Sequence, residues 1–97
     1  MQIRWSPGAA EDLEYIFSYI ARDSQAAAQR VVKGVYDRAG TLSAFPYLGK
    51  TGRVKGTREL PLTPLPYIIV YRTTHEIVEV VRIYHSAQDR RGANLTE

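Results

Sequence analysis

The chain of 97 residues is long enough for one domain, and 44% apolar residues are enough to form a hydrophobic core. The absence of cysteine excludes a disulfide scaffold, a thiol nucleophile and any cysteine-ligated metal centre, and a net charge of +3 identifies no partner by itself. No apolar run approaches the roughly 18 residues of a membrane span, and the N-terminus lacks the pattern of a signal peptide. We therefore expect one cytoplasmic domain over residues 1–97 with no membrane contact.

The N-terminal segment predicts a short strand followed by a helix. Residues 2–5 alternate between polar and apolar, and Ser6-Pro7 is a helix-start signal, with Ser6 as N-cap. Apolar residues spaced by 4, 3 and 4 define one helix face that ends near Ala21: Ala9, Leu13, Ile16 and Ile20. We expect three aromatic side chains to widen this buried face: Tyr15, Phe17 and Tyr19.

A second helix is predicted to begin after Asp23-Ser24, which has the composition of an N-cap. Its apolar stripe has spacings of 4, 3, 4 and 3: Ala28, Val32, Val35, Ala39 and Leu42. Because only two or three residues connect the helices, we expect an antiparallel helix hairpin.

Residues 43–57 contain Pro46 and three glycines, and are predicted to form a long loop of a kind that is often functional. The whole excess of positive charge lies in the second half of the chain, because residues 1–48 carry five bases and five acids. Four bases fall within nine residues that contain no acid, and we name this stretch the basic loop: Lys50, Arg53, Lys55 and Arg58. Such a local field favours a polyanion or an acidic protein, although a solvated loop explains it equally well.

The C-terminal part predicts three strands. Residues 57–62 suit a short strand that ends near Pro61, and residues 67–73 and 76–85 suit a hairpin turning at Thr74-His75. The order β-α-α-β-β-β predicts an α+β fold, with the helix hairpin packed on one face of a small antiparallel sheet. Residues 88–97 are predicted to be a frayed tail or a short helix.

The predicted hairpin turn divides the strand residues between two faces. One face would carry Arg72, Glu79, Ile83 and His85. The other would carry Tyr67, Ile69, Tyr71, Val80 and Arg82. Neither set is uniformly apolar, so the pattern leaves open which face meets the helices, and Arg72 could pair diagonally with Glu79 across the strands.

Five motifs follow one another along the chain from about residue 2 to about residue 90. They are W-S-P-x-A-x-x-D-L-x-x-I (Trp5 to Ile16), P-x-x-G (Pro46 to Gly49), R-E-L (Arg58 to Leu60), Y-I-I-V-Y-R (Tyr67 to Arg72) and V-R-I-Y-H (Val81 to His85). Their order and spacing resemble the RelE/ParE superfamily of type II toxin–antitoxin toxins. The resemblance implies a growth-inhibiting toxin of the plasmid-stabilisation type, neutralised by a cognate acidic antitoxin and bound to DNA only through that antitoxin.

The resemblance implies two alternative targets. RelE-like members cut messenger RNA in the ribosomal A site without a metal, whereas ParE-like members poison DNA gyrase. In the RelE-like pattern an arginine follows the aromatic residue that begins the third strand, and a second base or histidine lies near the end of the fourth. Ile68 and Gln88 hold these positions here, and neither can balance the charge on a phosphorane.

We therefore favour a gyrase poison with no catalytic, cofactor or metal site. A ribosome-dependent endoribonuclease is the alternative, as is a degenerate toxin that acts only as an antitoxin-binding module. For a nuclease, the candidate catalytic residues are Arg58 and His85, although a strand-end histidine hydrogen-bonded into the domain is commoner.

Binding of the antitoxin or the target needs no catalytic group, and its candidate residues are basic: Lys50, Arg53, Lys55, Arg58 and Arg82. The strand tyrosines Tyr67, Tyr71 and Tyr84 could stack on nucleic-acid bases, but core packing is the commoner role.

Overall fold

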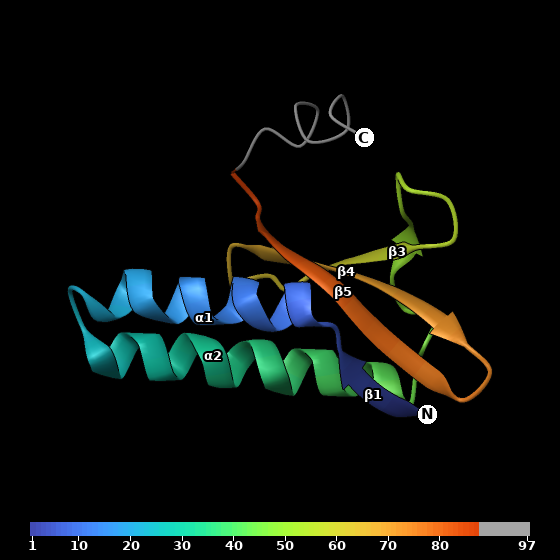
Figure 1. The fold of residues 1–97 in the computed structure, drawn as a ribbon, viewed down its shortest axis with the longest axis horizontal. Helices are drawn as coiled ribbons and strands as arrows, with labels where there is room; N and C mark the ends of the chain where they lie inside the picture. Colours follow the sequence, from blue (N-terminus) through green and yellow to red (C-terminus); the bar gives the residue numbers. More distant parts are fainter. Residues whose placement is uncertain (88–97) are drawn as a thin grey trace.

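The computed structural model describes residues 1–87, so the predicted tail and Gln88 lie outside the described residues. The elements are β1 (Gln2–Trp5), α1 (Pro7–Ala21), α2 (Gln25–Gly40), the 3-10 turn η1 (Thr41–Ser43), β2 (Lys50–Thr51), β3 (Arg58–Pro61), β4 (Tyr67–Thr74) and β5 (Ile77–His85). The two helices run side by side as a hairpin (Figure 1) and pack on one face of the sheet. The predicted α+β class and the covering of one sheet face by a helix hairpin are confirmed.

Both predicted N-caps are present. The Ser6 hydroxyl accepts a hydrogen bond from the backbone N–H of Ala9 at 3.1 Å, and Pro7 occupies the first helical position of α1. The Ser24 hydroxyl accepts from the backbone N–H of Ala27 at 3.1 Å and caps α2 in the same way. Local sequence signals therefore account for where both helices begin.

The core lies between the helix hairpin and the sheet. The helices and η1 contribute Ala9, Leu13, Ile16, Val35, Ala39 and Leu42. The strands contribute Tyr67, Ile69, Tyr71, Val78, Val80 and Ile83. The expected widening of the α1 face is wrong at two positions, because Tyr15 and Tyr19 are 71% and 60% exposed. These two rings stack on each other in solvent, with centroids 6.3 Å apart, and only Phe17 is partly buried.

The strands form one five-stranded sheet in the order β1-β5-β4-β3-β2. All neighbours are antiparallel except β1 and β5, which run parallel, so the sheet expected to be antiparallel is mixed. The helix hairpin and the other strands separate β1 from β5 in the chain, and such a long connection permits a parallel neighbour. The two-residue strand β2 lies within the predicted loop and extends the sheet at the opposite edge.

The β4–β5 hairpin turns at His75-Glu76, one residue later than predicted, because Thr74 pairs with Ile77. A β-bulge then shifts the register, since Val70 pairs with Arg82 whereas Tyr71 pairs with Val80. The extra residue of β5 exchanges the two faces for every later position.

Three face assignments in the hairpin are therefore wrong. Ile83 and His85 pair with Ile69 and Tyr67 on the helix-covered face, rather than sharing a face with Arg72. Arg82 lies on the opposite face of the sheet, which we name the open face.

Candidate functional site

The open face carries a row of side chains that crosses four strands. Lys50 of β2 pairs with Glu59 of β3, which pairs with Val70 of β4, which in turn pairs with Arg82 of β5. Val70 is buried although it lies outside the main core. In this row, the charged residues Glu59 and Arg82 on the neighbouring strands thus flank a buried valine.

A second row on the open face contains an ion pair between adjacent strands. Arg72 and Glu79 lie directly opposite each other, and Arg72 Nε donates to Glu79 Oε1 at 2.9 Å. The predicted pair is confirmed, with a direct rather than a diagonal register. Arg4 of β1 is the other cross-strand neighbour of Glu79.

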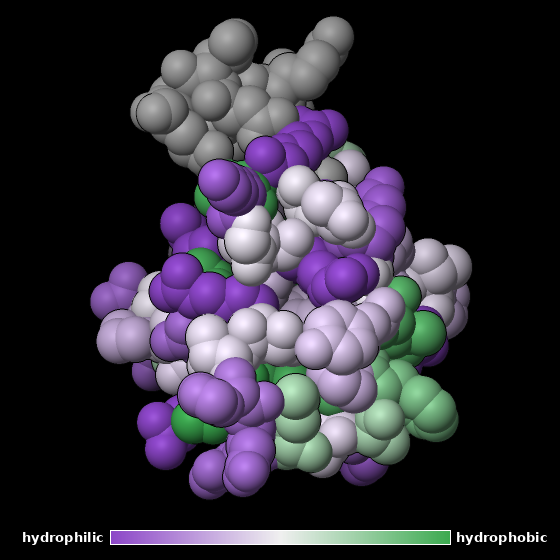
Figure 2. Space-filling model, turned by 90° about the vertical axis from the view of Figure 1, so that its right-hand side faces the viewer, coloured by the Kyte–Doolittle hydropathy of each residue, from purple (hydrophilic) through white to green (hydrophobic). Residues whose placement is uncertain are grey.

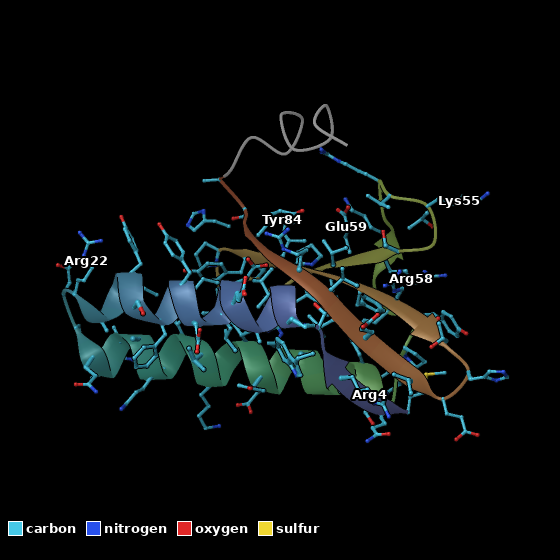
Figure 3. The ribbon with its side chains drawn as sticks, viewed as in Figure 1. Arg4, Arg22, Lys55, Arg58, Glu59 and Tyr84 are labelled. Atoms are coloured by element: carbon cyan, nitrogen blue, oxygen red, sulfur yellow. The ribbon has the colours of Figure 1, made fainter. Side chains whose placement is uncertain are left out.

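Glu59 is a buried carboxylate that sequence reasoning missed. It is 4% exposed, and its Oε2 accepts the backbone N–H of Arg53 at 3.2 Å. Figure 3 labels Glu59 next to Arg58, at the sheet end of the loop that carries Lys55. A carboxylate so placed ties the basic loop to β3. The available signal was that Glu59 is the first acid after Asp37.

The four bases of the basic loop divide into two groups. Lys50, Arg53 and Lys55 are exposed, and Figure 3 shows Lys55 pointing away from the body of the molecule. The loop that carries them closes on itself, because Gly52 N–H donates to Thr57 O at 2.8 Å and Thr57 N–H donates to Val54 O at 3.1 Å. Arg53 and Lys55 are therefore presented to solvent on an ordered turn, and Lys50 on the neighbouring strand β2.

Arg58 is half-buried and is used inside the domain. Its Nη1 donates to the carbonyl oxygen of Gly49 at 2.8 Å, and its guanidinium carbon lies 5.0 Å from the centroid of the Tyr47 ring. The buried hydroxyl of Tyr71 donates to Pro46 O at 2.9 Å and accepts from Gly49 N–H at 2.8 Å. Burial also raises the pKa of Tyr71, so this hydroxyl keeps its proton as a donor.

Arg82 joins β5 to α1. Its Nε and Nη2 donate to the two carboxylate oxygens of Asp12 at 2.8 Å and 3.2 Å, and Asp12 Oδ2 also accepts the backbone N–H of Ile83 at 2.9 Å. The hydrogen bond to Asp12 raises the pKa of the Arg82 guanidinium above its already high ordinary value. Arg82 is thus engaged by the helix that flanks its strand, although about half of its side chain is exposed.

His85 lies at the end of β5 and is hydrogen-bonded within the domain. Its Nδ1 accepts the backbone N–H of Ala87 at 3.1 Å, and its ring lies edge-on to Tyr67 with centroids 5.3 Å apart. Arg58 and His85 flank β4 on opposite sides and pair with Tyr71 and Tyr67, four residues apart. At a strand rise of about 3.4 Å per residue, this separates them by about 14 Å along the strand alone.

Of the two positions that distinguish the alternative targets, Ile68 lies within the described residues and Gln88 does not. Ile68 lies half-buried on the open face, with Pro61 and Tyr84 as its cross-strand neighbours. Gln88 falls outside the described residues. Across residues 1–87, no group of three or more potential metal-binding side chains comes together. Neither helix in that part of the chain has the length and apolar character needed to cross a membrane.

Comparison with known proteins identifies the family. The sequence model of the ParE toxin of the type II toxin–antitoxin system parDE matches residues 3–90. Y4kP of Sinorhizobium fredii, which carries the name of a toxin, is 40% identical over 87 residues that cover 90% of each chain. Toxin RelE2 of Caulobacter vibrioides is 36% identical over 87 residues, which cover 90% of this chain and 97% of RelE2.

Solved structures share the fold. A chain of the chromosomal ParDE toxin–antitoxin system from P. aeruginosa superposes with a TM-score of 0.78 at 25% identity, over 88% of this chain and 95% of that one. The YoeB dimer of Staphylococcus aureus gives a TM-score of 0.59 at 16% identity, over 88% of this chain and 97% of the YoeB chain. This chain therefore belongs to the ParE toxin family of the RelE/ParE superfamily, and is the toxin of a type II toxin–antitoxin system with a cognate antitoxin as its partner.

Proposed function

We propose that this toxin acts on DNA gyrase in the cytoplasm and does not cut messenger RNA. The observation that carries the proposal is Ile68, a half-buried hydrocarbon on the open face. The RelE-like pattern places an arginine at this position. Attack of a 2′-hydroxyl on its own phosphate builds negative charge, which a neighbouring isoleucine cannot stabilise. The match to the ParE family model supports the same target.

The separation of Arg58 from His85 supports the proposal independently. Proton transfer requires the acid and the base to lie within hydrogen-bonding reach of one reacting group. Arg58 donates to Gly49 O and contacts the Tyr47 ring, whereas His85 packs against Tyr67 at the other end of β4. These two side chains cannot serve one phosphate together.

We further propose that the antitoxin contacts the exposed bases of the basic loop, Lys50, Arg53 and Lys55. An acidic antitoxin segment would be attracted by this field, which accelerates association more than it strengthens the final complex. Arg58 and Arg82 are already engaged with Gly49 and Asp12, so we assign them the role of holding this surface in place.

A paired assay on one toxin preparation tests the target. Toxin separated from its antitoxin is added to gyrase with supercoiled DNA, and in parallel to a purified translation system. Stabilised DNA-cleavage complexes with intact messenger RNA are expected. Rapid A-site cleavage without DNA-cleavage complexes would contradict the proposal.

His85→Ala provides the matched control, because it removes the candidate general base and should leave gyrase poisoning unchanged. If messenger RNA were cut, His85→Ala and Arg58→Ala would each be expected to abolish the cleavage. Retained antitoxin binding with neither activity would contradict the gyrase proposal and identify a degenerate binding module.

A further inference from the structure

Three large apolar side chains are exposed where the chain leaves η1 for β2. Phe45, Tyr47 and Leu48 are 63%, 62% and 57% exposed. Figure 2, which looks at this end of the molecule, shows apolar residues gathered toward its lower right beside a broad hydrophilic area. Large apolar side chains that are exposed so close together in the chain are typical of an interaction site. We name Phe45, Tyr47 and Leu48 the apolar anchor.

The backbone of the anchor is held by the sheet beneath it. The Tyr71 hydroxyl binds Pro46 O and Gly49 N–H, and Arg58 Nη1 donates to Gly49 O, so three hydrogen bonds fix the two ends of the segment. Gly49 is buried, and a Cβ there would lie 2.8 Å from both Glu59 O and the Tyr71 ring. Only glycine therefore allows the chain to approach the sheet this closely.

This arrangement keeps the segment ordered while its side chains face solvent. The Arg58 guanidinium also lies against the Tyr47 ring, which restricts one of the three exposed side chains. Ordering a loop before binding removes an entropic cost that association would otherwise carry. Aromatic side chains presented in this way are typical centres of protein–protein binding.

The charge around the anchor indicates the chemistry of its partner. The anchor is followed directly by the exposed bases Lys50, Arg53 and Lys55. The one acid between residues 45 and 59 is Glu59, which is buried and directed at the backbone of Arg53. The surface therefore combines apolar area with a local excess of positive charge, which complements an acidic segment that has large apolar side chains.

We propose that the apolar anchor is a preformed docking site for an acidic segment of the cognate antitoxin. Apolar side chains of that segment pack on Phe45, Tyr47 and Leu48, and its carboxylates face the basic loop. Tyr71 and Arg58 are positioning residues for this site. The inference rests on the antitoxin-binding role proposed above for the basic loop and is independent of the toxin's target.

The main test removes the anchor from the full-length complex. Phe45→Ser combined with Leu48→Ser is co-expressed with the antitoxin, and dissociation of labelled antitoxin is measured. A loss of affinity of at least about 30-fold is expected, chiefly through faster dissociation. Tyr15→Ser combined with Tyr19→Ser, at equally exposed positions on α1, is the matched control and should change affinity less than about 3-fold.

A second variant tests the positioning role. Tyr71→Phe keeps the buried ring but removes the hydroxyl that binds Pro46 and Gly49. Affinity is expected to fall about 5- to 10-fold, and less than additively when Tyr71→Phe is combined with the two anchor substitutions. A merely structural role would lower the unfolding temperature while the folded protein bound the antitoxin normally.

Charge reversal separates this inference from the proposal on which it rests. Lys50→Glu with Lys55→Glu should slow association and weaken its salt dependence. If the charge reversals slow association but the anchor variant binds the antitoxin normally, the anchor proposal is wrong and the basic-loop proposal stands. If neither affects affinity, both are wrong. Loss of toxicity in the anchor variant with unchanged antitoxin affinity would assign the anchor to the target and overturn the proposal.

Discussion

The two faces of the sheet use the same strands for different purposes. On the covered face, Ile69, Tyr71 and Val80 are fully buried against the helices. On the open face of the same strands, Arg72 and Arg82 lie partly in solvent and each forms an ion pair. Burial of apolar area stabilises a domain far more than exposed ion pairs do. Substitutions on the covered face should therefore lower stability more than substitutions on the open face.

The largest contrast is expected between two adjacent isoleucines of β4. Ile69 is fully buried on the covered face, whereas Ile68 is half-buried on the open face. Ile69→Ala should lower the free energy of unfolding by about 3 kcal/mol because it leaves a cavity, and Ile68→Ala by about 1 kcal/mol or less. Chemical denaturation of the isolated toxin measures both. Equal losses of unfolding free energy in the two variants would contradict the proposed difference between the two faces.

A smaller effect is expected where the open face meets α1. Asp12 accepts two hydrogen bonds from Arg82 and a third from the backbone N–H of Ile83. Asp12→Ala should cost about 1–3 kcal/mol, because the Ile83 N–H loses its partner. Arg82→Ala removes a half-exposed ion pair and should cost less than about 1 kcal/mol. If denaturation shows that Arg82→Ala costs the more, the Ile83 contact is not the important one.

A weaker effect on stability, confined to alkaline pH, is expected from two tyrosines of the covered face. Burial raises the pKa of Tyr67 and of Tyr71 above the ordinary value of 10.0. As pH rises above 10, the unfolded chain loses these protons first, so it binds fewer protons than the folded chain and stability falls. The stability that this pKa difference contributes is fully present below pH 10, and it is lost as the pH rises through the raised pKa of the folded state.

Denaturation curves recorded at successive alkaline pH values measure this slope. Tyr67→Phe and Tyr71→Phe should each make the decline of stability with pH shallower, whatever their effect at neutral pH. A slope that is unchanged in both variants would show that the two hydroxyls titrate alike in the folded and unfolded chains.

The smallest effect is expected at the exposed cross-strand pair of Arg72 and Glu79. Their side chains are 52% and 36% exposed, so solvent and salt screen the interaction. Arg72→Ala should change the unfolding free energy by about 0.5 kcal/mol or less, and antitoxin affinity should not change. A loss above about 1 kcal/mol in denaturation experiments would indicate that the open face contributes to stability as the covered face does.

Much of the fold could be predicted because its signals are local. Ser6 and Ser24 cap their helices with hydroxyls that reach a backbone N–H only three residues away. The bulge in β5 could not be predicted, because it arises from pairing with β4 and no residue type marks it. That single extra residue placed Arg82 on the open face and Ile83 in the core, which reversed the face assignments made from alternation.

The candidate site was predictable in composition but not in function. The basic loop was visible as a stretch of bases, but which of them are available is a tertiary property. Arg58 is engaged because the chain folds back to place Gly49 and Tyr47 beside it. Glu59 looked like one acid of a short strand motif, and only its burial beside the loop showed a structural role.

The sequence by itself determined the helix hairpin, the α+β class and the toxin family, because caps, apolar periodicity and motif order are carried by residues close together in the chain. It also determined where the positive charge is concentrated. Only the tertiary structure decided which arginines are engaged, that Arg58 and His85 lie apart, and that Phe45, Tyr47 and Leu48 are exposed on a held backbone. Those properties depend on contacts between residues far apart in sequence, and local patterns carry no record of such contacts.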